Sequence, residues 1–113
     1  MGDRAHIVVK GDGSKVFLYT HWEGSNIADV VKAALKRVPG RWQDVAYLTR
    51  AMFCQFFDGI PEDRLSNELL SETGFGIASR PCEDTSRDIV VDVDKQTVKL
   101  PRKTAVSFAE FVK

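Results

Sequence analysis

Residues 5–22 read AHIVVKGDGSKVFLYTHW, and this stretch decides the fold. Two runs rich in β-branched and aromatic residues, 5–10 and 15–22, flank the GDGS segment at 11–14. Glycine, aspartate and serine are typical of the tight turns that join antiparallel strands. The sequence therefore predicts a β-hairpin at the beginning of the chain.

The register of this hairpin follows from its short turn. If Lys10 lies opposite Lys15, His6 falls opposite Tyr19 and Arg4 opposite His21. Because side chains alternate between the two faces of a strand, these last four residues share one face. The other face carries the apolar side chains of a core: Ala5, Ile7, Val9, Val16 and Leu18.

The remaining segments predict an α+β domain. Helical signals occur at 26–38, 44–57 and 61–74, and strand signals return at 75–79, 88–93 and 97–100. Ser107 and Glu110 have the spacing of a capping box for a short C-terminal helix. The predicted order is β-β-α-α-α-β-β-β-α, a mostly antiparallel sheet of about five strands with helices packed on one face. Antiparallel sheets can leave one face in water, so we expect the Arg4, His6, Tyr19 and His21 side chains on an open face.

Composition indicates one globular domain spanning residues 1–113. Sixteen basic and sixteen acidic residues cancel to a net charge of zero. Proteins that bind nucleic acid through phosphates usually carry a basic excess, so direct contact with nucleic acid is not expected, although charge can segregate on a neutral protein. Lys99, Arg102 and Lys103 form a small basic cluster, which we interpret as a solvated strand end.

The sequence predicts a cytoplasmic protein. The N-terminal residues show no apolar run after a basic start, and no stretch approaches the roughly 18 apolar residues of a membrane span. The two cysteines are far apart: Cys54 is expected in the core of a helix, and Cys82 follows Pro81 in a predicted loop. Two unrelated thiols suit a reducing compartment.

Two candidate metal sites have simpler structural interpretations. His6 and His21 with Asp3 or Asp92 contain enough ligands for zinc or iron, but no metal-binding spacing accompanies them. Asp88, Asp92 and Asp94 could hold a divalent cation, but Asp92 is expected opposite Lys99, as a cross-strand ion pair. We therefore expect no catalytic residue, no bound metal and no cofactor.

The aromatic residues favour a binding surface. Trp22 and Trp42 flank the first predicted helix, and such side chains combine apolar area with a polar tip. The alternative interpretation is that Trp22 and Trp42 close the two ends of the hydrophobic core. The predicted binding residues are Arg4, His6, Tyr19, His21, Trp22 and Trp42.

The segment from Leu18 to Gly24, together with residues 2–8, resembles a poorly characterised family of small phage, prophage and bacterial proteins with a Tyr-x-His-Trp-x-Gly-like segment. A looser similarity runs through residues 41–48, 73–77 and 89–93. At Glu23 the chain departs from the glycine common in that family. The resemblance implies a mobile-element lineage, in which small accessory proteins include inhibitors of host defence such as anti-CRISPR proteins.

Together these features predict a non-catalytic binding protein, acting on a host protein or a small ligand in the host cytoplasm. An open sheet face also suits a homodimer. The alternative is a small metal- or histidine-dependent hydrolase of a nucleotide-like substrate, with His21 as ligand or general base.

Overall fold

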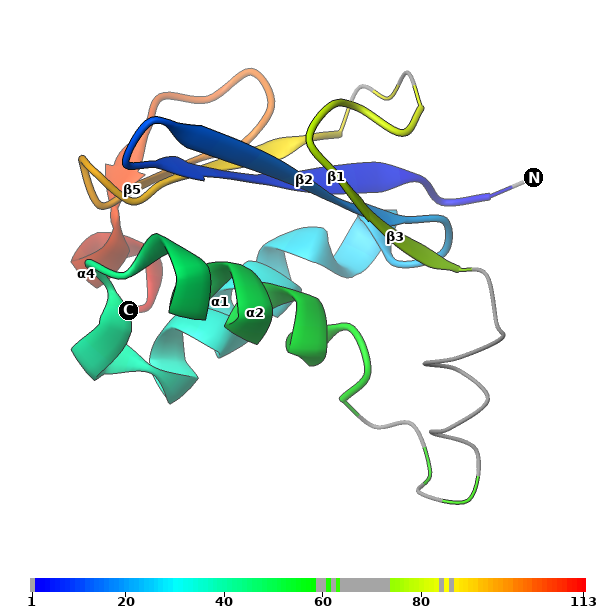
Figure 1. Cartoon of the computed structure of the whole chain (residues 1–113), viewed down its shortest axis with the longest axis horizontal. Coiled ribbons are helices and arrows are strands. Elements are labelled where there is room, and N and C mark those ends of the chain that lie inside the picture. Colours follow the sequence, from blue (N-terminus) through cyan, green and yellow to red (C-terminus); the bar gives the residue numbers. More distant parts are fainter. Residues whose placement is uncertain (1, 59–60, 62, 64–73, 84, 86) are drawn as a thin grey trace.

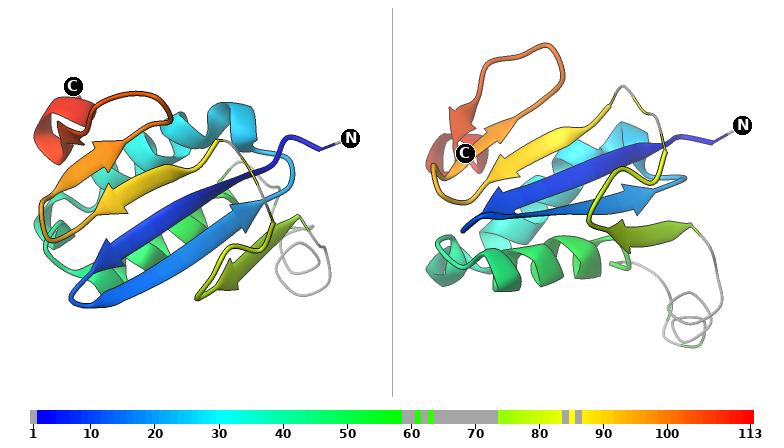
Figure 2. Two further views of the ribbon diagram at one scale, coloured as in Figure 1. Left: turned by 90° about the horizontal axis from the view of Figure 1, so that it is seen from above. Right: turned by 45° about the horizontal axis from the view of Figure 1, so that its top comes forward.

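The computed structural model describes residues 2–58, 61, 63, 74–83, 85 and 87–113. A six-stranded sheet is covered on one face by two helices, α1 and α2 (Figures 1 and 2). The strands are β1 (Ala5–Gly11), β2 (Ser14–Thr20), β3 (Phe75–Ala78), β4 (Ile89–Asp92), β5 (Thr97–Lys99) and β6 (Val106–Ser107). The helices are α1 (Ile27–Arg37), α2 (Val45–Gln55) and α4 (Phe108–Phe111), with short 3-10 turns η1 (Gly24–Asn26) and η2 (Pro39–Arg41).

The sheet order is β3-β2-β1-β4-β5-β6. Strand β1 is central: it pairs antiparallel with β2 and parallel with β4. All other neighbouring strands are antiparallel. The predicted α+β class and mostly antiparallel sheet are confirmed, with β6 as a two-residue strand that the sequence did not indicate.

The predicted hairpin register is confirmed. Lys10 pairs with Lys15, and His6 pairs with Tyr19. The predicted pairing of Asp92 with Lys99 is wrong, because Asp92 lies opposite Thr97 and Lys99 lies opposite Val90. Val93 leaves the strand, buries its side chain and donates its N–H to the Lys10 carbonyl, so the turn begins earlier than its polar residues suggest.

The core lies between the helices and one face of the sheet. Alternate strand residues supply it, because their side chains all point toward the helices. Residues with no measurable exposure include Ile7, Val9, Leu18, Val91 and Val98 from the sheet, Val31 and Leu35 from α1, Leu48 and Met52 from α2, and Phe108 from α4. This packing fixes which strand residues face away from the helices.

The helical predictions hold for the described residues, with one error inside α2. The Ser107 hydroxyl accepts the Glu110 N–H at 3.1 Å and caps α4 as predicted. Most of the helix predicted at 61–74, residues 62 and 64–73, lies outside the described residues. Cys54, expected in the core, is exposed. It is two residues from both Met52 and Phe56, and two helical steps of about 100° place it on the opposite side of α2.

Within the described residues, none of the helices has the length and apolar character needed to cross a membrane.

Candidate functional site

The residues predicted to share a face with His6 form a connected cluster with the segment that joins β3 to β4. The described residues of this connection, 79–83, 85, 87 and 88, rise over the sheet face that points away from the helices (Figure 1). They cover the end of that face at which β1 begins and β2 ends. We call Arg4, His6, Tyr19, His21, Glu83 and Asp88 the His6 cluster.

His6 fastens the connection to the sheet. Its side chain has no solvent exposure, although it points away from the helices. Nδ1 lies 3.0 Å from Asp88 Oδ1, and the Cys82 backbone N–H donates to Nε2 at 3.0 Å. Because an N–H donor occupies Nε2, the neutral ring carries its proton on Nδ1 and donates it to Asp88.

Asp88 receives further bonds that hold its carboxylate beside His6. Its Oδ1 accepts the His6 backbone N–H at 3.0 Å and the hydroxyl of Thr85. The carboxylate is thus tied both to β1 and to its own connection. Such an aspartate orients a histidine, as in hydrolase sites, but here the histidine's other nitrogen is occupied by a backbone amide.

Tyr19 lies beside His6 and is 9% exposed. Its ring centroid is 5.4 Å from that of His6, and its hydroxyl donates to Glu83 Oε2 at 3.0 Å. Burial, followed by the neighbouring Glu83 carboxylate, raises the pKa of Tyr19 above its usual value of 10.0. Tyr19 is therefore held as a neutral donor.

His21 completes the cluster at its rim. Arg4 Nε donates to His21 Nδ1 at 3.2 Å and also contacts Glu83 Oε2 at 3.1 Å. The Tyr19 hydroxyl oxygen lies 3.2 Å from the same His21 nitrogen. Each of these polar groups has a partner within the cluster, and the described residues include no buried side-chain nitrogen or oxygen without one.

Asp3 and Arg87 join the N-terminal residues to the same connection. Asp3 Oδ2 accepts the Ser25 N–H at 2.8 Å, and Asp3 Oδ1 forms an ion pair with Arg87. These hydrogen bonds with Ser25, and then the Arg87 charge, lower the pKa of Asp3 below its usual 3.8. Gly24 also donates its backbone N–H to the Asp3 carbonyl.

Trp22 is the exposed member of the Tyr-x-His-Trp segment. Its ring meets that of His21 edge-on at 4.3 Å, yet 61% of the residue remains exposed. The Thr20 hydroxyl accepts the backbone N–H groups of Trp22 and Glu23, which turns the chain away from β2. A Cβ at Gly74 would lie 2.9 Å from Trp22 Cδ1, so a glycine allows this close approach.

The start of β3 passes beside Trp22. His21 N–H donates to the Gly74 carbonyl at 2.8 Å, which fixes the hydrogen-bonded pairs of β2 and β3. Since such pairs alternate in antiparallel sheets, the backbone groups of Phe75 and Ile77 point toward the outer side of β3. Ile77 is 59% exposed. We call the outer side of β3, with Ile77 near its end and Trp22 beside Gly74 at its start, the β3 edge.

The structure brings together five of the six predicted binding residues. Arg4, His6, Tyr19 and His21 are in contact, with Trp22 beside them. The prediction that this face is open is wrong for His6 and Tyr19, because the connection buries both. Trp42 lies apart from them: its Nε1 donates to the Leu35 carbonyl at 2.9 Å, and its ring packs edge-on against Phe108.

Sequence reasoning missed the residues that complete the His6 cluster. Asp88 and Cys82 follow His6 by 82 and 76 positions, and they lie in or beside a loop without periodicity. The only feature of the sequence that could have indicated these contacts was the polar character of this segment between two predicted strands. The described residues contain no group of three or more histidine, cysteine, aspartate or glutamate side chains arranged to hold a metal.

No protein-family model, no curated protein and no solved structure matches this chain. Its function must therefore be inferred from its own geometry.

Proposed function

We propose that the chain is a non-catalytic binding protein that acts by occupying a binding site on another protein. The contact is made through the β3 edge. One observation carries the proposal. Among the described residues, three large hydrophobic side chains are exposed, and two of them, Trp22 and Ile77, lie at this edge. Exposed apolar side chains beside unpaired strand backbone are a template for an added strand from a partner.

The β3 edge combines two sources of affinity. The outward backbone groups of Phe75 and Ile77, which pair with no other strand among the described residues, offer hydrogen bonds to an extended partner segment, and the Ile77 side chain offers apolar contact. Trp22 is of the residue type most enriched at energetically dominant interface positions. The His6 cluster supports this surface, because His21 packs against the Trp22 ring and bonds to Gly74.

The hydrolase alternative receives less support from the geometry. A general base needs an accessible lone pair, whereas His6 is fully buried and its Nε2 accepts the Cys82 N–H. His21, the residue assigned that role, has its Nδ1 within reach of both Arg4 and Tyr19. The polar groups of the cluster bind one another, which suits a structural role.

The segment that carries the family resemblance, Leu18 to Gly24, also supplies Trp22. We therefore extend the proposal to a protein of phage or mobile-element origin that works in the host cytoplasm. Its partner would be a host protein, and inhibition of a host defence system in the manner of anti-CRISPR proteins would be the biological role. A plaque assay on a host with an active CRISPR system, with and without the expressed chain, tests that role directly.

A capture experiment with matched variants tests the binding surface. Host lysate is passed over immobilised wild-type protein and over the variants Ile77→Lys and Trp22→Ala. The control is Tyr47→Ala, because Tyr47 is the exposed large hydrophobic residue among those described that lies away from the β3 edge. We expect one partner to be retained by wild type and by Tyr47→Ala and to be reduced at least tenfold by Ile77→Lys. Mass spectrometry identifies the partner, and isothermal titration with the purified partner measures its affinity.

Three results would contradict the proposal. Equal capture by wild type and Ile77→Lys would exclude the β3 edge. Retention of a metabolite instead of a protein, seen by native mass spectrometry, would favour sequestration of a small ligand. A dimer in sedimentation velocity that Ile77→Lys dissociates would make a second copy the occupant of this edge.

A further inference from the structure

A second surface lies on the part of the sheet that the 79–88 connection leaves uncovered. Lys10 and Lys15 face each other directly across β1 and β2. Lys99 alternates with the buried Val98, so it points away from the helices as well. We call Lys10, Lys15, Lys95 and Lys99 the lysine face.

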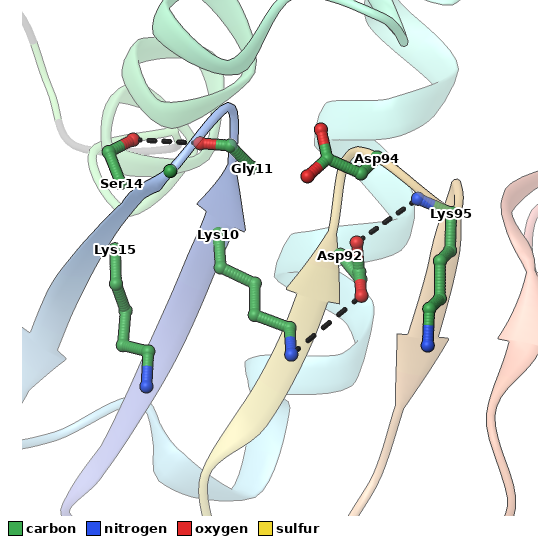
Figure 3. Close-up of a pocket in the computed structure, with 8 residues that line it drawn as sticks. Lys10, Gly11, Ser14, Lys15, Asp92, Asp94 and Lys95 are labelled. Atoms are coloured by element: carbon green, nitrogen blue, oxygen red, sulfur yellow. Dashed lines mark hydrogen bonds and ion pairs between the residues drawn. The ribbon is translucent and has the colours of Figure 1, made fainter.

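The lysine side chains extend in one direction. Figure 3 shows those of Lys10, Lys15 and Lys95 running side by side over a hollow of about 300 Å³. Asp92 lies between them, 3.7 Å from Lys10 Nζ, and it also accepts the backbone N–H of Lys95. Among the described residues, Lys15, Lys95 and Lys99 form no ion pair with a carboxylate.

The charges of this neutral chain are segregated. Asp94 points away from the lysines (Figure 3) and accepts the Asp12 backbone N–H. Asp94 lines the lysine hollow together with Asp92, and with Asp12 and Asp44 it also lines a second hollow beside the start of α2. The β5–β6 connection, residues 100–105, rises on the same side as the lysine face (Figure 1, orange) and adds the exposed Arg102 and Lys103. The cations of this sheet face thus outnumber Asp92 and Asp94, the aspartates that line the hollow with them.

Opposed lysines destabilise a hairpin, because like charges directly across two strands repel. Among the residues that the structure describes, Lys10 alone is compensated, by Asp92. The arrangement suits an anionic ligand that supplies the missing negative charge.

We propose that the lysine face binds the backbone phosphates of a double-stranded nucleic acid. Phosphate contacts are made by lysines, hydroxyls and backbone N–H groups, and here Thr97, opposite Asp92, adds a hydroxyl. Protein interfaces are depleted in lysine at their centres, which disfavours an acidic protein as the ligand.

A duplex fits better than a single strand. Proteins that hold single strands on a sheet stack the bases on exposed aromatic rings. The aromatic residues of this face, Phe17 and Tyr19, are each only 9% exposed. Contact is thus limited to phosphates, and binding should be independent of base sequence.

Fluorescence anisotropy with two labelled 20-base-pair DNA duplexes of unrelated sequence tests the proposal. We expect equal affinities, with a dissociation constant of about 10⁻⁶ to 10⁻⁴ M near physiological salt. Three uncompensated lysines predict a slope of about −3 in log affinity against log salt, or roughly a 40-fold loss between 50 and 200 mM KCl.

The test variant and its control each lose two positive charges. Lys15→Gln/Lys99→Gln should weaken binding at least tenfold at 50 mM KCl and reduce the slope by about 2. Lys32→Gln/Lys36→Gln, on α1 and thus on the helical side, should leave both unchanged. Urea unfolding of Lys15→Gln should show equal or higher stability at low salt, since a like-charge pair is removed.

The proposal is overturned if the α1 double variant weakens DNA binding as much as the sheet variant does. It is also overturned if polyglutamate binds more tightly than the duplex, or if ATP alone binds while the duplex does not. Those two outcomes would assign the lysine face to an acidic protein or to a small phosphorylated ligand.

Discussion

His6 shows how a polar residue can hold a loop on a sheet. It is fully buried, yet both of its ring nitrogens have partners, Asp88 on one side and the Cys82 N–H on the other. A buried polar group that loses its partner costs about 1–3 kcal/mol. Removing the imidazole leaves both the Asp88 carboxylate and the Cys82 amide without this bond.

His6→Ala should therefore lower the free energy of unfolding by about 3 kcal/mol, from the lost hydrogen bonds and the cavity. His6→Gln places an amide oxygen near the Nε2 position and should lose about half as much. Urea unfolding measures both variants. Amide hydrogen exchange should show the Cys82 N–H exchanging faster in His6→Ala; unchanged exchange at Cys82 would refute the role given to His6.

Tyr19 makes the free energy of unfolding depend on pH in the alkaline range. Its folded pKa is raised by burial and by Glu83, whereas the unfolded chain ionises near 10.0. The unfolded state thus releases its proton first, so this contribution is present below pH 10 and is lost as the pH rises toward the folded pKa. Tyr19→Phe should flatten this decline in urea unfolding between pH 9 and 11. Tyr47→Phe, which retains Tyr19, should decline like wild type; a flat profile for both variants would assign the effect elsewhere.

Among single elements, α2 depends on its N-cap residue, Asp44, for a defined start. Asp44 Oδ1 accepts the Tyr47 N–H at 3.1 Å and satisfies one of the free donors of the first helical turn. The η2 turn precedes this cap, and Trp42 anchors the junction through its bond to the Leu35 carbonyl. The cap therefore decides where α2 begins to pack on the sheet.

Asp44→Ala should destabilise the protein by about 1 kcal/mol, because the cap is lost. Asp44→Ser can accept the same N–H and should recover most of the loss. Thermal unfolding followed by circular dichroism measures both variants. Equal destabilisation by alanine and serine would show that the carboxylate charge, beside Asp12 and Asp94, matters more than the hydrogen bond.

For the whole molecule, the sequence predicted what depends on nearby residues. The hairpin register, both long helices and the cap of α4 follow from turn composition, periodicity and local hydrogen bonding. The burial of His6 and Tyr19 did not follow, because residues 79–88 cover them only once β4 has paired with β1. The predicted pairing of Asp92 with Lys99 failed because a two-residue shift of register keeps the same side chains on the core face, so hydrophobic alternation could not distinguish the two registers.

The grouping of lysines on the lysine face could not be predicted from the sequence either. Lys15 and Lys99 are 84 positions apart, and they share a face only through the order of the strands. The net charge of zero gave no indication that these lysines share one surface. The basic cluster at Lys99, Arg102 and Lys103 was visible in the sequence, but Lys10, Lys15 and Lys95 join it only in the fold.

The central position of β1 has a consequence for synthesis. One of its edges is covered by β2 within the first 20 residues, whereas the other stays open until β4, ending at Asp92, has been made. An emerging chain therefore carries an unpaired, strongly apolar strand edge until β4 has been made. The fold should close only once Asp92 has left the ribosome, so the nascent protein depends on chaperones or on rapid synthesis of the segment between β2 and β4.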